Sequence, residues 1–383
     1  MKPVHRQLLA LLLAVVLGFS FVYGQVHLSI TKYGQWYHDA DYVQQTWREA
    51  PELNAVLPDE AVRRALKAFA PKGGRVLLVA AGKAAWQMAH AAVEALGRVD
   101  GGVVVTKYGH VKGEIPGVTC CEAGHPVPDE NSLKATQRAI ELVRDLTERD
   151  TVLFLISGGG SALFEKPLIS LKELQDITSD LLASGADIVS MNTVRKRLSS
   201  VKGGKFARLC APAHVYAIVL SDIIGDPLDM IASGPAYPDS STCEEAMEVI
   251  RKFKIMLPEN AEKALREETP KTLDNVETVI TGSVTELAAA GQQAAEELGY
   301  EPWLLTTSLN CQAKEAGSFL AAIGRQYAAS GKKMAVLAGG ETVVHLHGRG
   351  KGGRNQEIAL SAADGIAGLD NVAVFSFGSD GTD

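Results

Sequence analysis

The stretch TVLFLISGGGSAL, residues 151–163, contains the pattern that decides the fold. An apolar, β-branched run ends in small residues, and a helical segment follows. An uninterrupted apolar run is typical of a strand that is buried on both faces of a sheet. The sequence therefore predicts an α/β fold with mainly parallel, Rossmann-like sheets. The same order recurs in residues 75–96, 214–226, 276–299, 333–344 and 372–383.

Small or polar residues end every one of these predicted strands. The ends read AGK, SGGGS, SD, TGS, GGET and GSDGTD. Parallel α/β sheets bind their ligands beyond the carboxyl ends of the strands. We therefore expect a phosphate-binding edge there.

Composition and charge narrow the class of partner. The chain has 383 residues, with 46% hydrophobic residues and a net charge of −7. No basic field covers the chain, which argues against a nucleic-acid partner. Positive charge is instead local, in residues 191–205 and 347–354, as a small anionic ligand requires.

The cysteines and the N-terminus point to different compartments. Five scattered cysteines without a CxxC pair form neither a disulfide framework nor a zinc site, which favours a reduced, cytoplasmic setting for the catalytic body. Residues 8–24 are an apolar run after Lys2, His5 and Arg6, typical of a signal peptide or a short anchor. Export or membrane contact through residues 8–24 is the minority expectation. A buried first helix or a misassigned start codon are the alternatives.

The polar stretch 257–275, which contains two prolines, predicts a boundary between two lobes. We therefore expect a leader at 1–35, an N-terminal α/β domain at 36–256, a linker at 257–275 and a C-terminal α/β domain at 276–383.

The glycine-rich loop SGGGSA directly follows the strand at 151–156. Its glycines let backbone N–H groups turn toward an anion, and the two serines add donors. The loop lacks the GK[ST] ending of a Walker A loop and does not match GxGxxG. A plain tight turn is the alternative to phosphate binding. Ser170 and Glu173, further on, predict a capping box at the next helix.

Residues 191–207 predict one helix that starts near Asn192 or Thr193 and ends at Gly203–Gly204. Its spacing would place Arg195, Ser199 and Lys202 on one polar stripe. We expect that stripe to face an anion, with a solvated surface as the alternative.

Two other strand ends carry charge. Asp222 and Asp226 follow the strand at 214–220 and are suited to Mg²⁺, although aspartates also cap turns. Lys83 stands where a helix begins, which opposes the helix dipole and suggests a function. Arg354 opens a helix after glycines and is placed to bind phosphate or carboxylate in a bidentate manner.

Seven collinear motifs between residue 55 and residue 383 resemble the glycerate 2-kinase family, whose C-terminal part is the MOFRL domain. The resemblance implies ATP-dependent phosphorylation of D-glycerate at its 2-hydroxyl, with Mg²⁺, in a cleft between two lobes. The motifs are LVAAGKAAWQMA, GHPVPDENS, LISGGGSALFEKP, MNTVRKRLSSVKGGKFA, VLSDIIGDPLDMIASGP, ITGS and LAGGETVVHLHGRGKGGRNQEIAL.

The resemblance also implies roles for individual residues. Lys83 and Arg354 are expected at the catalytic centre. Phosphate contacts are expected from Ser157, Gly158, Gly159, Gly160, Ser161, Lys202, Gly282 and Ser283. Substrate contacts are expected from Asn192, Arg195 and Glu341, and metal contacts from Asp222 and Asp226.

Two features depart from the family pattern. The apolar leader replaces a short helical start, and the sequence stops at FGSDGTD, where the family continues through a further loop and a helix. We therefore expect a truncated C-terminal domain. The alternatives are an NAD(P)H-dependent hydroxypyruvate reductase, for which no GxGxxG with a following acidic residue is present, and an inactive binder of nucleotide or sugar acid.

Lys83→Ala and Arg354→Ala are each expected to lower kcat by orders of magnitude, because each removes a charge that neutralises the transferring group. The melting temperature of both variants is expected to stay close to that of the wild type. Steady-state kinetics and thermal melts test this, and wild-type turnover in either variant would remove that residue from the mechanism.

Overall fold

The computed structural model describes residues 29–32, 35–37, 57–221, 228–345 and 352–376. The apolar run 8–24, Asp222 and Asp226, residues 346–351 and residues 377–383 lie outside the described residues. The chain divides into two compact units, and each is described by itself. The sheet unit comprises residues 61–220 and 226–281, and the C-terminal unit contains residues 282–383 together with 1–60 and 221–225.

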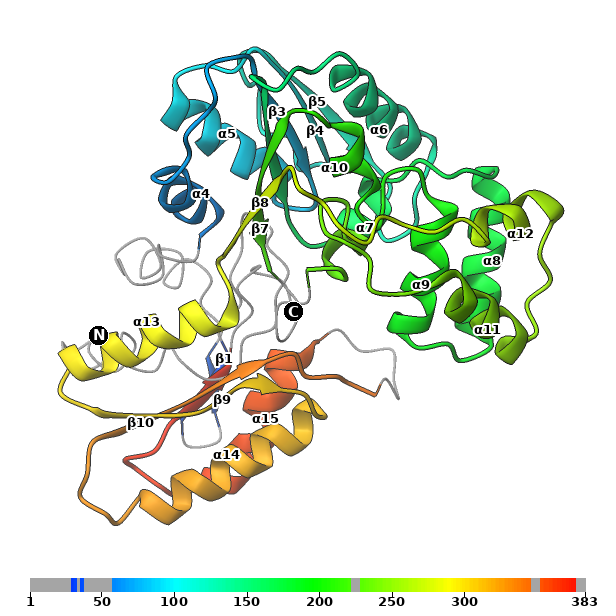
Figure 1. Ribbon diagram of the computed structural model, residues 1–383. Coiled ribbons are helices and arrows are strands. Elements are labelled where there is room, and N and C mark those ends of the chain that lie inside the picture. Colours follow the sequence, from blue (N-terminus) through cyan, green and yellow to red (C-terminus); the bar gives the residue numbers. More distant parts are fainter. Residues whose placement is uncertain (1–28, 33–34, 38–56, 222–227, 346–351, 377–383) are drawn as a thin grey trace. The chain divides into compact units, whose positions relative to one another are not determined.

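A six-stranded sheet forms the centre of the sheet unit (Figure 1). All neighbouring strands are parallel, in the order β5-β4-β3-β6-β7-β8, so the predicted parallel α/β sheet is confirmed. The order reverses between β3 and β6, where the chain changes direction across the sheet. The strands are β3 (Val76–Ala81), β4 (Gly101–Lys107), β5 (Val118–Ala123), β6 (Thr151–Ile156), β7 (His214–Leu220) and β8 (Val276–Thr281).

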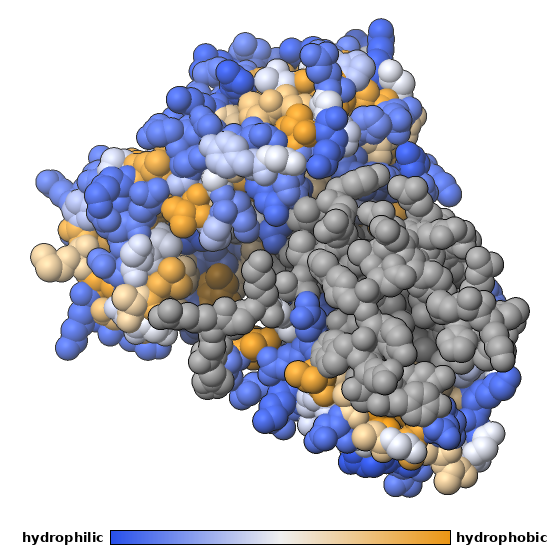
Figure 2. Space-filling model, turned by 180° about the vertical axis from the view of Figure 1, so that it is seen from behind, coloured by the Kyte–Doolittle hydropathy of each residue, from blue (hydrophilic) through white to orange (hydrophobic). Residues whose placement is uncertain are grey.

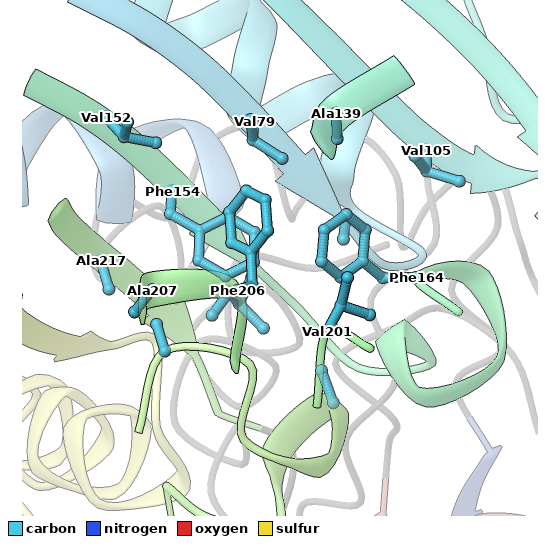
Figure 3. Close-up of a cluster of buried hydrophobic side chains, with 14 of the residues drawn as sticks. Val79, Val105, Ala139, Val152, Phe154, Phe164, Val201, Phe206, Ala207 and Ala217 are labelled. Carbon is cyan, nitrogen blue, oxygen red and sulfur yellow. The ribbon is translucent and has the colours of Figure 1, made fainter. Parts of the chain in front are cut away.

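Helices cover both faces of this sheet, which explains why its central strands are apolar without alternation. On one face, Phe154, Phe164 and Phe206 pack together, with ring centroids 4.9–5.6 Å apart (Figure 3). On the other face, Tyr216 donates a hydrogen bond to the carbonyl of Ala65 at 2.8 Å. The first face carries α6 (Glu130–Leu142), α7 (Gly160–Leu163) and α10 (Lys205–Leu209), and the second carries α4 (Pro58–Leu66) and α5 (Ala85–Leu96).

Strands β4 and β5 do not appear among the predicted strands. Strand β5 is an edge strand of sequence VTCCEA, and only Ala123 in it is fully buried, so its apolar pattern is weak. Strand β8, which the predicted boundaries assign to the C-terminal domain, pairs with β7 in the sheet unit. The predicted linker 257–275 contains helix α12.

Four helices with a separate apolar core extend the sheet unit: α8 (Leu171–Ala183), α9 (Ile188–Leu198), α11 (Cys243–Phe253) and α12 (Glu259–Leu265). The predicted capping box at Ser170 and Glu173 is confirmed at the start of α8.

The prediction of one helix over 191–207 is wrong. Helix α9 begins after its N-cap Asp187, and its last helical residue is Leu198. The reason is a contact from α10. Its first residue, Lys205, donates hydrogen bonds through Nζ to the carbonyls of Lys196, Arg197 and Ser199 at 2.6–3.2 Å. These contacts satisfy the last carbonyls of α9. Lys202 therefore does not continue the stripe that contains Arg195.

The described part of the C-terminal unit has two small sheets. Strands β9 (Glu301–Leu309) and β10 (Met334–Gly340) are parallel, whereas β1 (Ser29–Lys32) pairs antiparallel with both β2 (Gln35–Tyr37) and β11 (Val374–Ser376). The helices of this unit are α13 (Val284–Glu297), α14 (Ala313–Tyr327) and α15 (Arg354–Ile366).

Hydrophilic side chains predominate on the face that Figure 2 shows, and apolar side chains are interspersed among them. Within the described residues, no helix is both long enough and apolar enough to cross a membrane.

Phe206→Ala is expected to lower the free energy of unfolding by about 3–5 kcal/mol, because it leaves a cavity among the three aromatic rings of the core. Urea denaturation followed by circular dichroism measures the change. Met256→Ala is the control, since that side chain is 88% exposed and its loss is expected to change stability by less than about 0.5 kcal/mol. Equal midpoints for the two variants would contradict this account of the core.

Candidate functional site

The turns after β3 and β6 lie side by side where the strand order reverses, the position at which open α/β sheets bind ligands. The Lys83 backbone N–H donates to the carbonyl of Gly158 at 2.8 Å. In the same region, the Ala84 N–H donates to Ser157 Oγ at 3.1 Å. Strand pairing thus brings together two regions predicted as site residues from separate motifs, Lys83 and the loop Ser157–Ser161.

The glycine-rich loop has backbone donors to offer. The N–H groups of Gly158, Gly159 and Gly160 have no hydrogen-bond acceptor among the described residues. Gly159 has φ 81°, a left-handed conformation that favours glycine. Consecutive N–H groups in such a turn form a concave anion-binding site.

His125 adds a third strand end to this site. A Cβ placed on Gly159 would lie 3.0 Å from both Cδ2 and Nε2 of His125 and 3.1 Å from Cγ of Lys83. The imidazole, the lysine and the glycine loop therefore meet at one point. His125 is absent from the predicted site residues because β5, which it follows, was not recognised as a strand. Its position in GHPVPDENS, just beyond a sheet edge, is the signal that would have found it.

The surroundings of His125 are positively charged. Burial, followed by the charges of Lys83, Lys107 and His110, lowers the pKa of His125 to about 4. His110 is tied to the same region, because its Nδ1 lies 3.2 Å from the carbonyl oxygen of Lys83. At neutral pH, His125 is therefore uncharged beside the cationic side chain of Lys83 and the glycine loop.

A chain of hydrogen bonds links the glycine loop to α9. Ser161 Oγ lies 2.9 Å from Ser233 Oγ, which donates to Asn192 Oδ1 at 3.1 Å. Arg195 Nη2 donates to the carbonyl of Ser161 at 3.0 Å. The structure thus brings Asn192 and Arg195, predicted as substrate ligands, against the loop. Their direct contact with substrate stays a prediction.

The turn that carries Ser233 is strained. Ala232 and Ser233 have φ 52° and 61°, both left-handed and neither glycine. A Cβ on Gly160 would lie 2.6 Å from the Cβ of Ala232, so this turn presses directly on the loop. Such conformations cost on the order of 1–3 kcal/mol each and gather at functional sites. Ser233 belongs to the site although its sequence signal, the SGP turn, is weak.

Lys202 is fully buried and forms an ion pair with buried Glu165 at 2.9 Å, while its Nζ also donates to the carbonyl of Phe164 at 2.9 Å. Burial lowers the pKa of Lys202 to about 8. These contacts place Lys202 in a buried ion pair next to the residues that follow the loop. Its contact with phosphate stays a prediction.

In the C-terminal unit, the structure brings Arg354 and Glu341 together. Arg354, the first residue of α15, forms an ion pair with Glu341, and its Nη1 also donates to the carbonyl of Thr342 at 3.3 Å. Gly282 and Ser283 lie at the start of α13, where Ser283 is the N-cap. The Gly282 N–H donates to Glu286 Oε2 at 2.8 Å, so this amide already has an anionic partner.

The predicted metal ligands Asp222 and Asp226 lie outside the described residues. Within the described part of the chain, one cluster has three suitable groups, namely Cys243, Glu244 and Glu268. Lys271 Nζ lies 2.6 Å from Glu268 Oε2, and the Cys243 backbone N–H also bonds that carboxylate. A thiol and a neutralised carboxylate do not fit the all-oxygen shell of Mg²⁺.

Comparison with known proteins identifies the family. Residues 43–266 match the family described as a domain of unknown function (DUF4147), and residues 334–383 match the MOFRL family. The chain is 53% identical over 340 residues to a D-glycerate 2-kinase of Thermotoga maritima, covering 86% of this chain and 81% of that protein. The chain belongs to the glycerate 2-kinase family.

Two further comparisons agree with this family assignment. A crystal structure of glycerate kinase from Thermotoga maritima has a TM-score of 0.80 and 52% identity, covering 83% of this chain and 78% of that one. A glycerate 2-kinase of Pyrococcus horikoshii is 41% identical over 349 residues, covering 86% of this chain and 78% of the relative. The resemblance seen in the seven motifs is thereby confirmed.

Gly159→Ala is expected to lower kcat by roughly 10²-fold, because its methyl group would displace His125 and Lys83, and a misplacement of about 1 Å at a reacting centre costs about that much. Gly185→Ala is a matched control. It has φ 79° but no atom within 4 Å of the added Cβ, so it carries the same backbone strain without the crowding. Steady-state kinetics of both variants decide the matter, and equal kcat values would contradict the proposed contact.

Proposed function

We propose that the chain is an ATP-dependent D-glycerate 2-kinase that binds its anionic substrates at the turns after β3, β5 and β6. The observation that carries this proposal is the meeting of Lys83, His125 and three loop amides that have no acceptor in the described part of the chain, at the point where the strand order reverses. The names and identities of the relatives support the choice of substrate.

Phosphoryl transfer asks a protein mainly for alignment and charge neutralisation. Lys83 Nζ would neutralise a phosphoryl oxygen or the glycerate carboxylate, and the amides of Gly158–Gly160 would hold the phosphate oxygens. Arg195 and the Ser233–Asn192 pair would fix the loop that presents those amides, because they bond Ser161 at its carbonyl and its hydroxyl. Each role concerns the sheet unit alone.

We include Mg²⁺ as a cofactor because the phosphates of ATP carry several negative charges. A bound Mg²⁺ would neutralise charge on the nucleotide phosphates. Asp222 and Asp226 remain the proposed ligands, since the one described cluster of candidate ligands does not fit the ion.

A hydroxypyruvate reductase is the rival function. It would need a dinucleotide site, and the loop after β6, SGGGS, lacks the spacing of GxGxxG. The Lys83 side chain and the loop amides are suited to binding the phosphate groups of a phosphoryl donor. A nicotinamide is not needed for that role.

With Mg-ATP, the protein is expected to release ADP only when D-glycerate is present and to form 2-phosphoglycerate. A coupled assay for ADP, with the product position determined by phosphorus NMR, measures this. Chelation of Mg²⁺ is expected to abolish turnover, and its re-addition to restore it. Oxidation of NADH with hydroxypyruvate in place of ADP release would reject the proposal.

A further inference from the structure

We propose that His125 is a catalytic residue, the base that accepts the proton of the glycerate hydroxyl as this oxygen attacks ATP. The inference rests on the proposed kinase function and deepens it by naming the proton acceptor. The Nε2 edge of the imidazole faces Gly159 beside the Lys83 side chain.

The ring nitrogens of His125 are available to a ligand. Neither has a hydrogen-bond partner among the described residues, although the side chain is half-buried. His110 differs, since its Nδ1 donates to the carbonyl of Lys83. A histidine that serves packing alone usually has its ring nitrogens fixed by a partner. A free imidazole edge next to an anion-binding loop suits contact with a substrate hydroxyl.

The charges that face His125 keep it able to accept a proton. Lys83 follows β3, while Lys107 and His110 lie at and after the end of β4, and all three disfavour the imidazolium form. Asp129, at the start of the helix that follows His125, is engaged by Tyr108 Oη at 2.6 Å and the Ser132 N–H at 2.9 Å. Burial, the largest cause, and these charges together lower the pKa of His125, so the free enzyme holds it neutral.

Substrate binding strengthens this base. A phosphate or carboxylate bound against Lys83 offsets the positive charge near the imidazole, and a nearby negative charge raises the pKa of a histidine. The proton affinity of His125 thus rises when the anionic substrates are in place. A base is most effective when its pKa lies near the working pH.

The 2-hydroxyl proton of glycerate passes to Nε2 of His125 in the tautomer that carries hydrogen on Nδ1. The oxygen's electron pair forms the new bond to the γ-phosphorus of ATP. The bond from that phosphorus to the β–γ bridging oxygen breaks, and its electron pair leaves with ADP. His125 then releases its proton to solvent.

The test compares wild type, His125→Gln and His125→Asn in the Mg-ATP and D-glycerate assay over a pH range that reaches below the free-enzyme pKa of His125, which is about 4. Loss of general-base catalysis is expected to lower kcat by roughly 10²–10⁴-fold in both variants. In the wild type, both kcat and kcat/KM are expected to fall at low pH, and this fall is the acidic limb of each profile. The limb of kcat, which reports the enzyme–substrate complex, is expected at a higher pH than that of kcat/KM, which reports the free enzyme, because bound anions raise the pKa of His125. Both variants are expected to lose this limb, which a purely structural role would not remove.

His90→Gln is the control, since that histidine lies on α5 and stacks on Trp86, outside the candidate site, and is expected to keep wild-type kinetics. Wild-type kcat in His125→Gln with the acidic limb unchanged would overturn the inference while leaving the kinase function intact. No turnover by the wild type would instead reject the kinase function. If both variants melt early, the wild-type profiles decide, and coincident limbs for kcat and kcat/KM would overturn the inference.

Discussion

The site depends on one constraint, which is the pairing of β3 with β6 at the point where the sheet reverses its order. Parallel register along six residue pairs, from Val76–Thr151 to Ala81–Ile156, brings the two strand ends to the same level. The turns beyond them then bond directly, through the Lys83 N–H and the Gly158 carbonyl. Lysine, glycine loop and imidazole come together because the strands beneath them are in register.

Much of this fold could be read from the sequence, because a buried parallel strand leaves a continuous apolar run. Strand β6, with every residue buried, is the clearest case. The edge strand β5 mixes cysteines, threonine and glutamate, so the same criterion fails there. The end of α9 was misplaced for another reason, since it depends on Lys205 reaching back to three carbonyls, a contact without periodicity.

The site was partly predictable for related reasons. Lys83 and the loop Ser157–Ser161 follow strong strands, so their convergence follows from the topology. Lys202 has the right charge, yet burial beside Glu165 gives it a structural partner, and a one-dimensional pattern does not show burial. His125 was missed together with β5, the strand that positions it. Charge and spacing thus pointed to the sheet edge that carries the candidate site, whereas packing, which they do not show, determines which side chains there are buried.

The peptide of Lys83 is held on both sides: its N–H by Gly158, and its carbonyl by Thr106 Oγ1 and His110 Nδ1, each at 3.2 Å. None of these bonds uses the lysine side chain. The backbone at this position is therefore held in place independently of the side chain. The side chain of residue 83 can thus be exchanged to alter acceptor preference while these backbone hydrogen bonds are retained.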